Sequence, residues 1–227
     1  MARQDIISNN ARSRGRPAGN GATDRRDHIL DHASRLFAEQ GLEATSVQMI
    51  ADAAGVDRRL VYHYFDSKDK LYLEVLASIY GELTGLAQAL LPGTTNIEQF
   101  VDVLCRTFFQ FCLDHRPFVQ MLMWENLRGA KGLRTVPVAG QVIKGARPKL
   151  QVLLDEAVAD GRCRGDLDPT QIIMSCLGMS LYPITNAASL NTILDIDTST
   201  DAFRERWLEH MIQTIIHGLR PPSENTP

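Results

Sequence analysis

Four side chains between residues 58 and 63 have the chemistry of a surface that contacts nucleic acid. They are Arg58, Arg59, Tyr62 and His63. Arginine can donate two hydrogen bonds to guanine in the major groove, and tyrosine hydroxyl and histidine ring N–H groups suit phosphate oxygens. The segment therefore predicts a short helix with a polar face that meets DNA.

Lys68 offers a separate contact to a phosphate backbone. It falls in the first turn of a helix that Ser67 is expected to cap. The free N–H groups of a helix start attract an anion, so a phosphate there would meet both these groups and the lysine charge. A structural alternative stays open, in which Val61, Tyr64 and Phe65 pack a small core and the arginines are merely solvated.

Three short helical patterns would position these side chains. Apolar spacing predicts helices over 24–40, 45–54 and 57–65, and Gly41 and Gly55 end the first two. Thr45 followed by Gln48 has the spacing of a capping box. Two short helices joined by a two-residue turn containing glycine make a helix-turn-helix candidate.

The remainder of the chain is predicted to be helical too. A helix over 67–91 would be nearly 40 Å long at about 1.5 Å per residue, long enough to connect two domains. Further helices are expected over 96–116, 118–127, 138–160, 169–189 and 203–219, with 138–160 bent or restarted near Pro148 and a loop over 129–137. No alternating strand pattern occurs. The predicted fold is all-α, with a head at 23–66 and a larger helical domain at 67–220.

Charge is distributed unevenly along an otherwise ordinary composition. Hydrophobic residues make up 44% and charged residues 22%, which is typical of a globular protein. The formal net charge is −3, yet residues 1–26 carry six arginines against two aspartates, a net charge of +4 that leaves −7 for the rest. A basic arm, predicted disordered over 1–22, ahead of an acidic body indicates that one end meets a polyanion.

Several other functions lack support in the sequence. No GxSxG, P-loop, GxGxxG or ExxH pattern occurs, so we expect neither an enzyme nor a cofactor. His28 and His32 have helical metal-site spacing but no third ligand, and we expect no metal. The four cysteines form no CxxC pair, which favours buried thiols in a reducing compartment. No segment reaches the roughly 18 apolar residues of a membrane span, and no secretory signal is visible, so we expect a cytoplasmic protein.

The window from Thr45 to Lys70, with LFAEQG at Leu36–Gly41 before it, resembles the DNA-binding head of the TetR family of transcriptional regulators. The similarity covers about 50 residues. Its matching positions are Thr45, Ile50 (one place late), Ala51, Ala54, Gly55, Val56, Tyr62, Tyr64, Phe65, Lys68 and Leu71. The resemblance implies base or groove contacts by Gln48, Arg58, Arg59 and Leu60, and phosphate contacts by Thr45, Tyr62, His63 and Lys68.

Two further DNA features follow. The family often has a small residue where this chain has Arg59, so the operator sequence is not predicted, although a guanine contact is favoured. Arg14-Gly15-Arg16-Pro17 resembles the core of a minor-groove AT-hook. Arg14 and Arg16 would read an A·T-rich minor groove or, alternatively, add only salt-sensitive affinity without sequence preference.

The resemblance also implies a small-molecule pocket in the helical domain, for an unknown, partly apolar effector. Large adaptable side chains with a few polar groups gather between residues 96 and 190, a composition that suits a pocket or an ordinary core. The candidates are Cys105, Phe108, Phe109, Met121, Trp124, Glu125, Asn126, Tyr182 and Asn186.

The last two predicted helices are candidates for a dimer interface. Small residues in 169–189 allow close approach, and the apolar stripe of 203–219 is wide, so helices from two chains would form a four-helix bundle. The candidates are Ile173, Leu177, Trp207, Met211 and Ile215. Burial within one chain is the alternative.

These observations predict a homodimeric, sequence-specific DNA-binding regulator, a repressor released by a ligand that tilts the 67–91 helix. A helix-turn-helix dimer would read a palindromic operator. Two other classes stay open: a small-molecule-binding helical protein without specific DNA binding, and an architectural binder of A·T-rich DNA.

Overall fold

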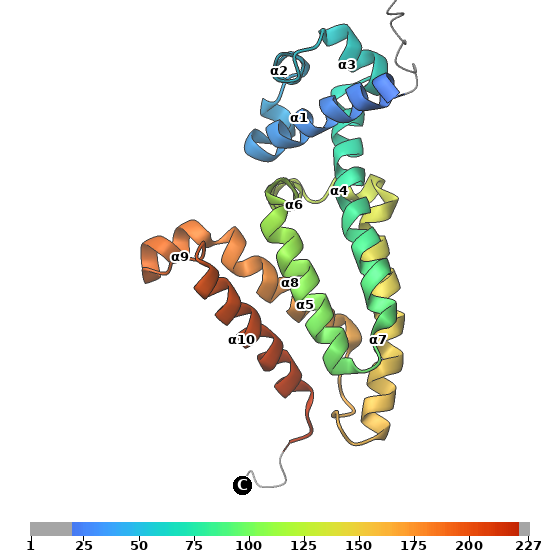
Figure 1. The fold of residues 1–227 in the computed structure, drawn as a ribbon, viewed down its shortest axis with the longest axis vertical. Coiled ribbons are helices and arrows are strands. Elements are labelled where there is room, and N and C mark those ends of the chain that lie inside the picture. The colour runs from blue at the N-terminus through green and yellow to red at the C-terminus, as the bar shows by residue number, and fades with distance from the viewer. Residues whose placement is uncertain (1–19, 223–227) are drawn as a thin grey trace, which may run out of the picture.

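The structure is a computed structural model that describes residues 20–222, which form ten α-helices joined by short connections (Figure 1). Within these residues there is no strand, in agreement with the predicted all-α fold. Figure 1 shows a small head, α1 to α3, at one end of a longer body, α4 to α10. No helix of the described range is long and apolar enough to cross a membrane.

The head consists of α1 (Asn20–Ala44), α2 (Val47–Ala53) and α3 (Arg58–Phe65). Its core contains side chains that are almost completely buried: Ile29, Ala33, Phe37, Ile50, Ala51, Val61 and Phe65. Gly41 interrupts the helical backbone of α1 with φ of 77° and ψ of 173°, a conformation essentially restricted to glycine. The predicted break at Gly41 is confirmed, although helical turns resume as far as Ala44.

The start of α2 corrects the predicted capping box. The N-cap is Ser46, whose side chain accepts a hydrogen bond from the Met49 backbone N–H at 3.1 Å. Thr45 is buried instead, and its hydroxyl donates to the carbonyl oxygen of Gly41 at 2.7 Å. The hydroxyl of Thr45 therefore helps to close the kinked end of α1, and a cap one residue later serves α2.

The turn between α2 and α3 is longer than predicted. Residues 54–57 separate the two helices, rather than two residues. Gly55 has a positive φ of 62°, which glycine adopts without steric cost. Asp57 is the N-cap of α3 and accepts a hydrogen bond from the Arg59 N–H at 2.7 Å.

The body begins with α4 (Lys68–Leu90), which leaves the head and runs along the body beside α7 (Figure 1). Ser67 caps α4 as predicted, accepting from the Lys70 N–H. The other body elements are η1 (Leu91–Gly93), α5 (Ile97–Asp114), α6 (Arg116–Leu127), η2 (Leu133–Thr135), η3 (Pro137–Gly140), α7 (Gln141–Ala159), α8 (Pro169–Thr185), α9 (Ala187–Leu194) and α10 (Asp201–Leu219). Helix α7 continues through Pro148, so the predicted restart there is wrong.

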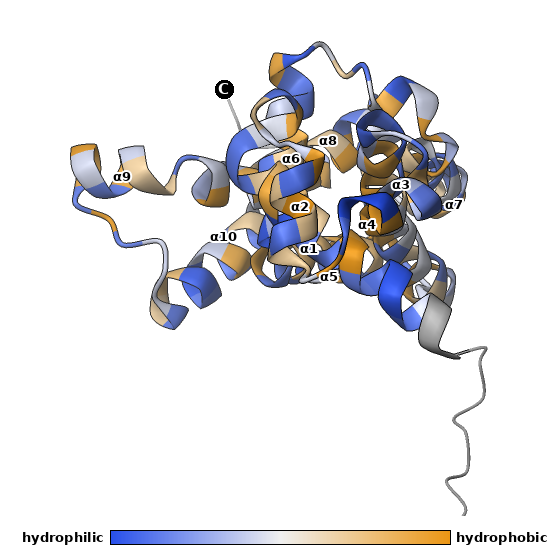
Figure 2. Ribbon diagram, turned by 90° about the horizontal axis from the view of Figure 1, so that it is seen from above, coloured by the Kyte–Doolittle hydropathy of each residue, from blue (hydrophilic) through white to orange (hydrophobic). Residues whose placement is uncertain are grey.

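Helix α8 ends earlier than predicted. It stops at Thr185 instead of residue 189, and Asn186 separates it from α9, which the sequence interpretation missed. Helix α9 has no buried residue, and Ile193 is 76% exposed. Figure 2 shows α9 extending away from the remaining helices. A helix in this position packs little against its own chain.

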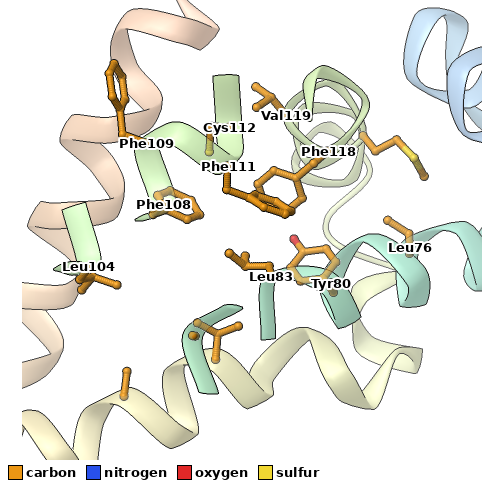
Figure 3. Close-up of a cluster of buried hydrophobic side chains, with 14 of the residues drawn as sticks. Leu76, Tyr80, Leu83, Leu104, Phe108, Phe109, Phe111, Cys112, Phe118 and Val119 are labelled. Atoms are coloured by element: carbon orange, nitrogen blue, oxygen red, sulfur yellow. The ribbon is translucent and has the colours of Figure 1, made fainter. Parts of the chain in front are cut away.

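Aromatic side chains fill the centre of the body where α4, α5 and α6 meet (Figure 3). The ring of Phe118 contacts Tyr80 and Phe111 edge to face, with centroid distances of 5.3 and 5.2 Å. Burial raises the pKa of the Tyr80 hydroxyl to about 12. This part of the aromatic-rich composition therefore forms core.

Candidate nucleic-acid interface and cavities

Helix α3 presents its polar side chains to solvent as predicted. Arg58, Arg59, Tyr62 and His63 are all exposed. One guanidinium nitrogen of Arg58 donates to the Tyr62 hydroxyl oxygen at 3.1 Å, and the guanidinium carbon lies 5.3 Å from the centre of the tyrosine ring. This pairing holds the arginine over one face of the helix, where two of its donors can be offered together to a base edge.

The neighbouring α2 contributes one exposed candidate, Gln48. Its side-chain amide donates to Asp52 Oδ1 at 2.8 Å, so the amide is held along the helix surface. Leu60 is different, because its side chain is half-buried and packs against the core of the head. The groove contact predicted for Leu60 is not supported, since apolar packing in the head uses most of this side chain.

Lys68 has a structural role that the sequence did not indicate. Its ammonium donates to the carbonyl oxygens of Leu42 at 2.8 Å and Thr45 at 2.9 Å. The lysine thus ties the end of α1 to the start of α4. Its predicted phosphate contact would have to use the remaining N–H. The predicted phosphate contact of the Thr45 hydroxyl is wrong, because that hydroxyl is buried and donates inward.

Most of the predicted arm, residues 1–19 with Arg14 and Arg16, lies outside the described residues, so the minor-groove prediction stays a prediction. Residues 20–22 belong to α1, so the boundary predicted for the arm at residue 22 is wrong.

Trp124 of α6 joins the body to the head rather than lining a pocket. Its indole Nε1 donates to the carbonyl oxygen of Ala38 in α1 at 3.0 Å. A Cβ placed on Gly41 would lie only 3.2 Å from the Trp124 ring. The glycine is therefore required twice, for its backbone conformation and for this close approach.

A buried carboxylate lies next to this contact. Glu125 is completely buried, and its two oxygens accept hydrogen bonds from the Tyr72 hydroxyl at 2.9 Å and the Leu133 backbone N–H at 3.0 Å. The guanidinium of Arg128 lies 3.8 Å away. Burial, followed by the Glu125 carboxylate, raises the pKa of Tyr72, which keeps its proton as the donor. Tyr72 also packs edge to face on Phe37 of α1, so α1, α4 and α6 meet here.

The body contains several cavities. The first, of about 210 Å³, lies between α4 and α7. The second, of about 350 Å³, lies between α5 and α6 on one side and the region from the end of α8 to the start of α10 on the other. The third, of about 410 Å³, is lined by Glu98, Arg162 and Cys163 together with the end of α10. Phe109 lines the second cavity as predicted, whereas Phe108 lines only a small apolar gap of about 20 Å³ in the core.

The other predicted pocket residues line none of these three cavities. Cys105 and Met121 are buried in packed core, Asn126 and Tyr182 are exposed, and Asn186 caps the turn into α9. The reason for these errors is common to them: residue type alone does not distinguish packed core from cavity wall. Trp124 and Glu125 are corrected as well, because they belong to the junction with the head.

The cysteines are poorly suited to redox chemistry. All four are buried and free. A hydrogen bond that the Cys105 thiol donates to the Cys176 side chain, followed by burial, raises the pKa of Cys105, and burial raises that of Cys112 to about 12. Thiols with raised pKa values are weak nucleophiles near neutral pH. Among residues 20–222, no group of three or more potential ligands is arranged for a metal.

The predicted dimer residues are mostly part of the protomer core. Ile173, Met211 and Ile215 are buried within the chain, so their assignment to an interface is wrong. Trp207 is half-buried and donates from Nε1 to the Met179 carbonyl oxygen at 2.9 Å, and Leu177 is half-buried as well. The opposite side of α8 is exposed instead. We call it the α8 stripe: Gln171, Met174, Ser175, Gly178 and Tyr182.

Comparisons with known proteins match both parts of the chain. Residues 29–75 match the family described as bacterial regulatory proteins, tetR family, and residues 98–215 match the family described as tetracyclin repressor-like, C-terminal domain. The HTH-type transcriptional repressor NicS of Pseudomonas putida is 26% identical over 201 residues, which cover 86% of this chain and 92% of NicS. The repressor KstR2 of Mycolicibacterium smegmatis is 35% identical over 147 residues, covering 63% and 70% of the two chains.

The fold is similar to solved structures. The ketosteroid transcriptional regulator KstR2 of Mycobacterium tuberculosis has a TM-score of 0.66 at 22% identity, and the match covers 87% of this chain and 95% of that one.

Proposed function

The chain belongs to the TetR family of bacterial regulatory proteins and is a DNA-binding transcriptional regulator; from this premise we propose that it is a dimeric repressor whose affinity for a palindromic operator falls when a small molecule binds in the body. Helix α3 supplies the reading surface, with Arg58 and Arg59 directed at bases and Tyr62 and His63 at phosphates. Lys68, at the start of α4, adds a further phosphate contact. Gln48 of α2 adds a contact at the groove edge.

Dimerisation uses exposed rather than buried residues. The α8 stripe combines apolar Met174 and Tyr182 with small Ser175 and Gly178, which let a second helix approach closely. Exposed positions of α10 lie beside it, because α8 and α10 pack on each other. Two such pairs from two chains form a four-helix bundle, and its symmetry would match that of the operator.

The observation that carries the repressor proposal is the junction between head and body. Trp124 contacts Ala38 and Gly41 of α1 from α6, and Glu125 on the same helix holds Tyr72 of α4. Helix α6 also lines the cavity of about 350 Å³. A ligand that shifts α6 must therefore shift the head, and a hundredfold loss of operator affinity requires about 2.7 kcal/mol of difference in ligand binding between the two states.

The test begins with selection of bound duplexes from a random DNA pool at about 0.15 M salt, which suppresses non-specific phosphate binding. We expect enrichment of a palindrome by a dimer. A folded dimer that enriches no sequence would overturn the proposal and favour a ligand-binding protein without specific DNA binding. Enrichment limited to A·T-rich DNA without a palindrome would favour an architectural binder.

The repressor part is tested on a reporter gene under the selected operator. We expect lower expression in the presence of this protein. Higher expression would assign an activator instead, with the DNA-binding proposal intact.

A further inference from the structure

We call the cavity of about 350 Å³ between α5, α6 and the α8–α10 region the lateral cavity. Its lining combines a mostly apolar wall with two arginines. We propose that it binds an amphipathic anion, an apolar chain or ring system carrying one carboxylate or phosphate, and that this anion is the effector. The effector role rests on the proposed function above, whereas the binding itself does not.

Apolar side chains form most of the wall. They come from three directions: Phe109, Cys112 and Leu113 of α5, Val119 and Met123 of α6, and Pro183, Ile184, Ala187, Ala188 and Phe203 of the α8–α10 region. The volume is within the range of roughly 300–1,000 Å³ of small-molecule sites. The pocket would therefore hold the apolar part of a ligand out of water.

Two arginines supply the polar side of the cavity. Arg116, at the start of α6, and Arg204, in the first turn of α10, both line it, and none of its described lining residues carries a carboxylate. Thr185, Thr198 and Ser199 add hydroxyl groups to the lining of the same cavity. Charge-assisted bonds from guanidinium groups to carboxylate or phosphate are among the stronger hydrogen bonds in proteins.

Arg204 has a donor that the protein leaves unused. Its Nε is buried and has no hydrogen-bond partner, the one such side-chain atom among the described residues. A second guanidinium nitrogen lies 3.5 Å from Asp201, whose side chain is 91% exposed, and Asp197 also faces the arginine from the preceding turn. These solvated carboxylates offset the charge only weakly. A buried unpaired donor is unfavourable, so the protein itself satisfies Arg204 incompletely, and an anion in the cavity would meet the guanidinium group of this lining residue.

The position of the lateral cavity also links it to the head. Met123 lines the cavity, and the next residue, Trp124, contacts α1. The cavity between α4 and α7 has no α6 residue in its lining, and none of its lining residues has an unpaired buried donor. Its lining cation is Lys149. The lateral cavity is therefore the better placed of the two to receive an anion and to move the head.

Binding is tested on the full-length dimer by isothermal titration calorimetry, without DNA. The probes are dodecanoate, dodecanoyl-coenzyme A and the neutral dodecan-1-ol, all below their micelle concentrations. We expect at least one of the two anions to bind at least tenfold more tightly than dodecan-1-ol. The two anions distinguish a free carboxylate from a phosphate-bearing thioester.

Arginine variants locate the site. Arg204→Gln and Arg116→Gln are each expected to weaken the bound anion at least tenfold and to leave dodecan-1-ol unchanged. Arg134→Gln, an exposed arginine of η2 outside the cavity, is the matched control and should bind like the parent protein. Equal affinity for anion and alcohol, or unchanged anion affinity in both cavity variants, would overturn the proposal.

Operator binding is measured separately, with the same proteins. If the variants lose anion affinity but still bind the selected operator, the lost interaction lies in the lateral cavity and the DNA-binding head is intact. Anion binding by a protein that enriches no operator would instead refute the repressor proposal and keep the binding site. The two failures are thereby distinguished.

Discussion

Two pairs of arginines, one in the head and one in the body, are both arranged to meet an anion but are assembled in different ways. Arg58 and Arg59 are consecutive residues on the first turn of α3, and both are exposed. Arg116 and Arg204 come from α6 and α10 and meet across a largely apolar cavity. The first pair contacts a polyanion that approaches from outside, where charge and helix geometry suffice. The second can recognise only what enters, so the tertiary packing defines its specificity.

The same contrast separates local from tertiary control elsewhere. In the head, caps and glycines act within a few residues, as Ser46, Gly55 and Asp57 do. At the junction, Gly41, Trp124 and Glu125 act through partners distant in the sequence. Substitutions at the junction should therefore change stability, whereas those of the exposed residues of α3 should change DNA binding alone.

Gly41→Val tests this separation with the largest expected effect. Valine is strained at a φ of 77°, and its Cβ would approach the Trp124 ring to 3.2 Å. We expect a loss of about 3 kcal/mol in the free energy of unfolding, measured by urea titration. Gly85→Ala, on α4 with open space around it, is the control and should gain up to about 1 kcal/mol. Equal small effects of both substitutions would contradict the close approach of head and body.

Arg58→Ala probes the exposed pair. We expect operator affinity to fall by about 2 kcal/mol, roughly thirtyfold, with little change in the free energy of unfolding and relaxed preference at one base position. Binding titrations on the operator and on a random duplex of equal length measure the difference. Similar losses of affinity on both duplexes would show that Arg58 contacts the phosphate backbone rather than a base.

Tyr72→Phe removes one hydrogen bond at the junction and keeps the ring that packs on Phe37. Glu125 then loses the hydroxyl donor to its buried carboxylate, so we expect about 1.5 kcal/mol less stability. Tyr62→Phe, at an exposed position of α3, provides the control for loss of a hydroxyl group, since the urea titration is done without DNA. Unchanged urea midpoints in both variants would show that the Glu125 contact contributes little.

Lys68→Ala has the smallest expected effect on DNA and sharpens the division between local and tertiary roles. As a phosphate contact, Lys68 should contribute equally to all sequences, so its loss lowers the slope of log affinity against log salt by about one. Lys144→Ala, on exposed α7 surface, should leave the slope unchanged. An unchanged slope in Lys68→Ala, together with a lower melting temperature, would show that Lys68 stabilises the fold through its bonds to Leu42 and Thr45 and does not contact phosphate.

Much of the head could be predicted because its signals are local. The positions of Arg58, Arg59, Tyr62 and His63 follow from helical spacing, and the structure exposes all four. The errors displaced a feature by only one or a few residues; for example, the N-cap of α2 is Ser46 instead of Thr45. Their physical cause is that either hydroxyl can cap a helix in an isolated segment, and only the carbonyl of Gly41 in the kinked end of α1 draws Thr45 inward.

The body was predicted less well because residue types do not tell which helices come to lie close together. Aromatic and methionine side chains are equally suited to a packed core and to a cavity wall, so Met121 and Phe109 looked alike in sequence. Ile173, Met211 and Ile215 have the spacing of an interface, yet they pack inside one protomer. Nothing in the sequence indicated that Arg204 lines a cavity, since an arginine in an amphipathic helix is usually solvated.

The amino-acid order was enough to specify the all-α architecture, the limits of most helices and the polar face of α3, because periodicity, caps and helix breakers act over a few residues. Long-range packing selected which apolar residues are buried, brought Trp124 against Gly41, enclosed Glu125 with Tyr72 and placed Arg116 and Arg204 around one cavity. Those outcomes depend on which helix faces meet. That choice minimises exposed apolar area over the whole chain, and no local window contains the information.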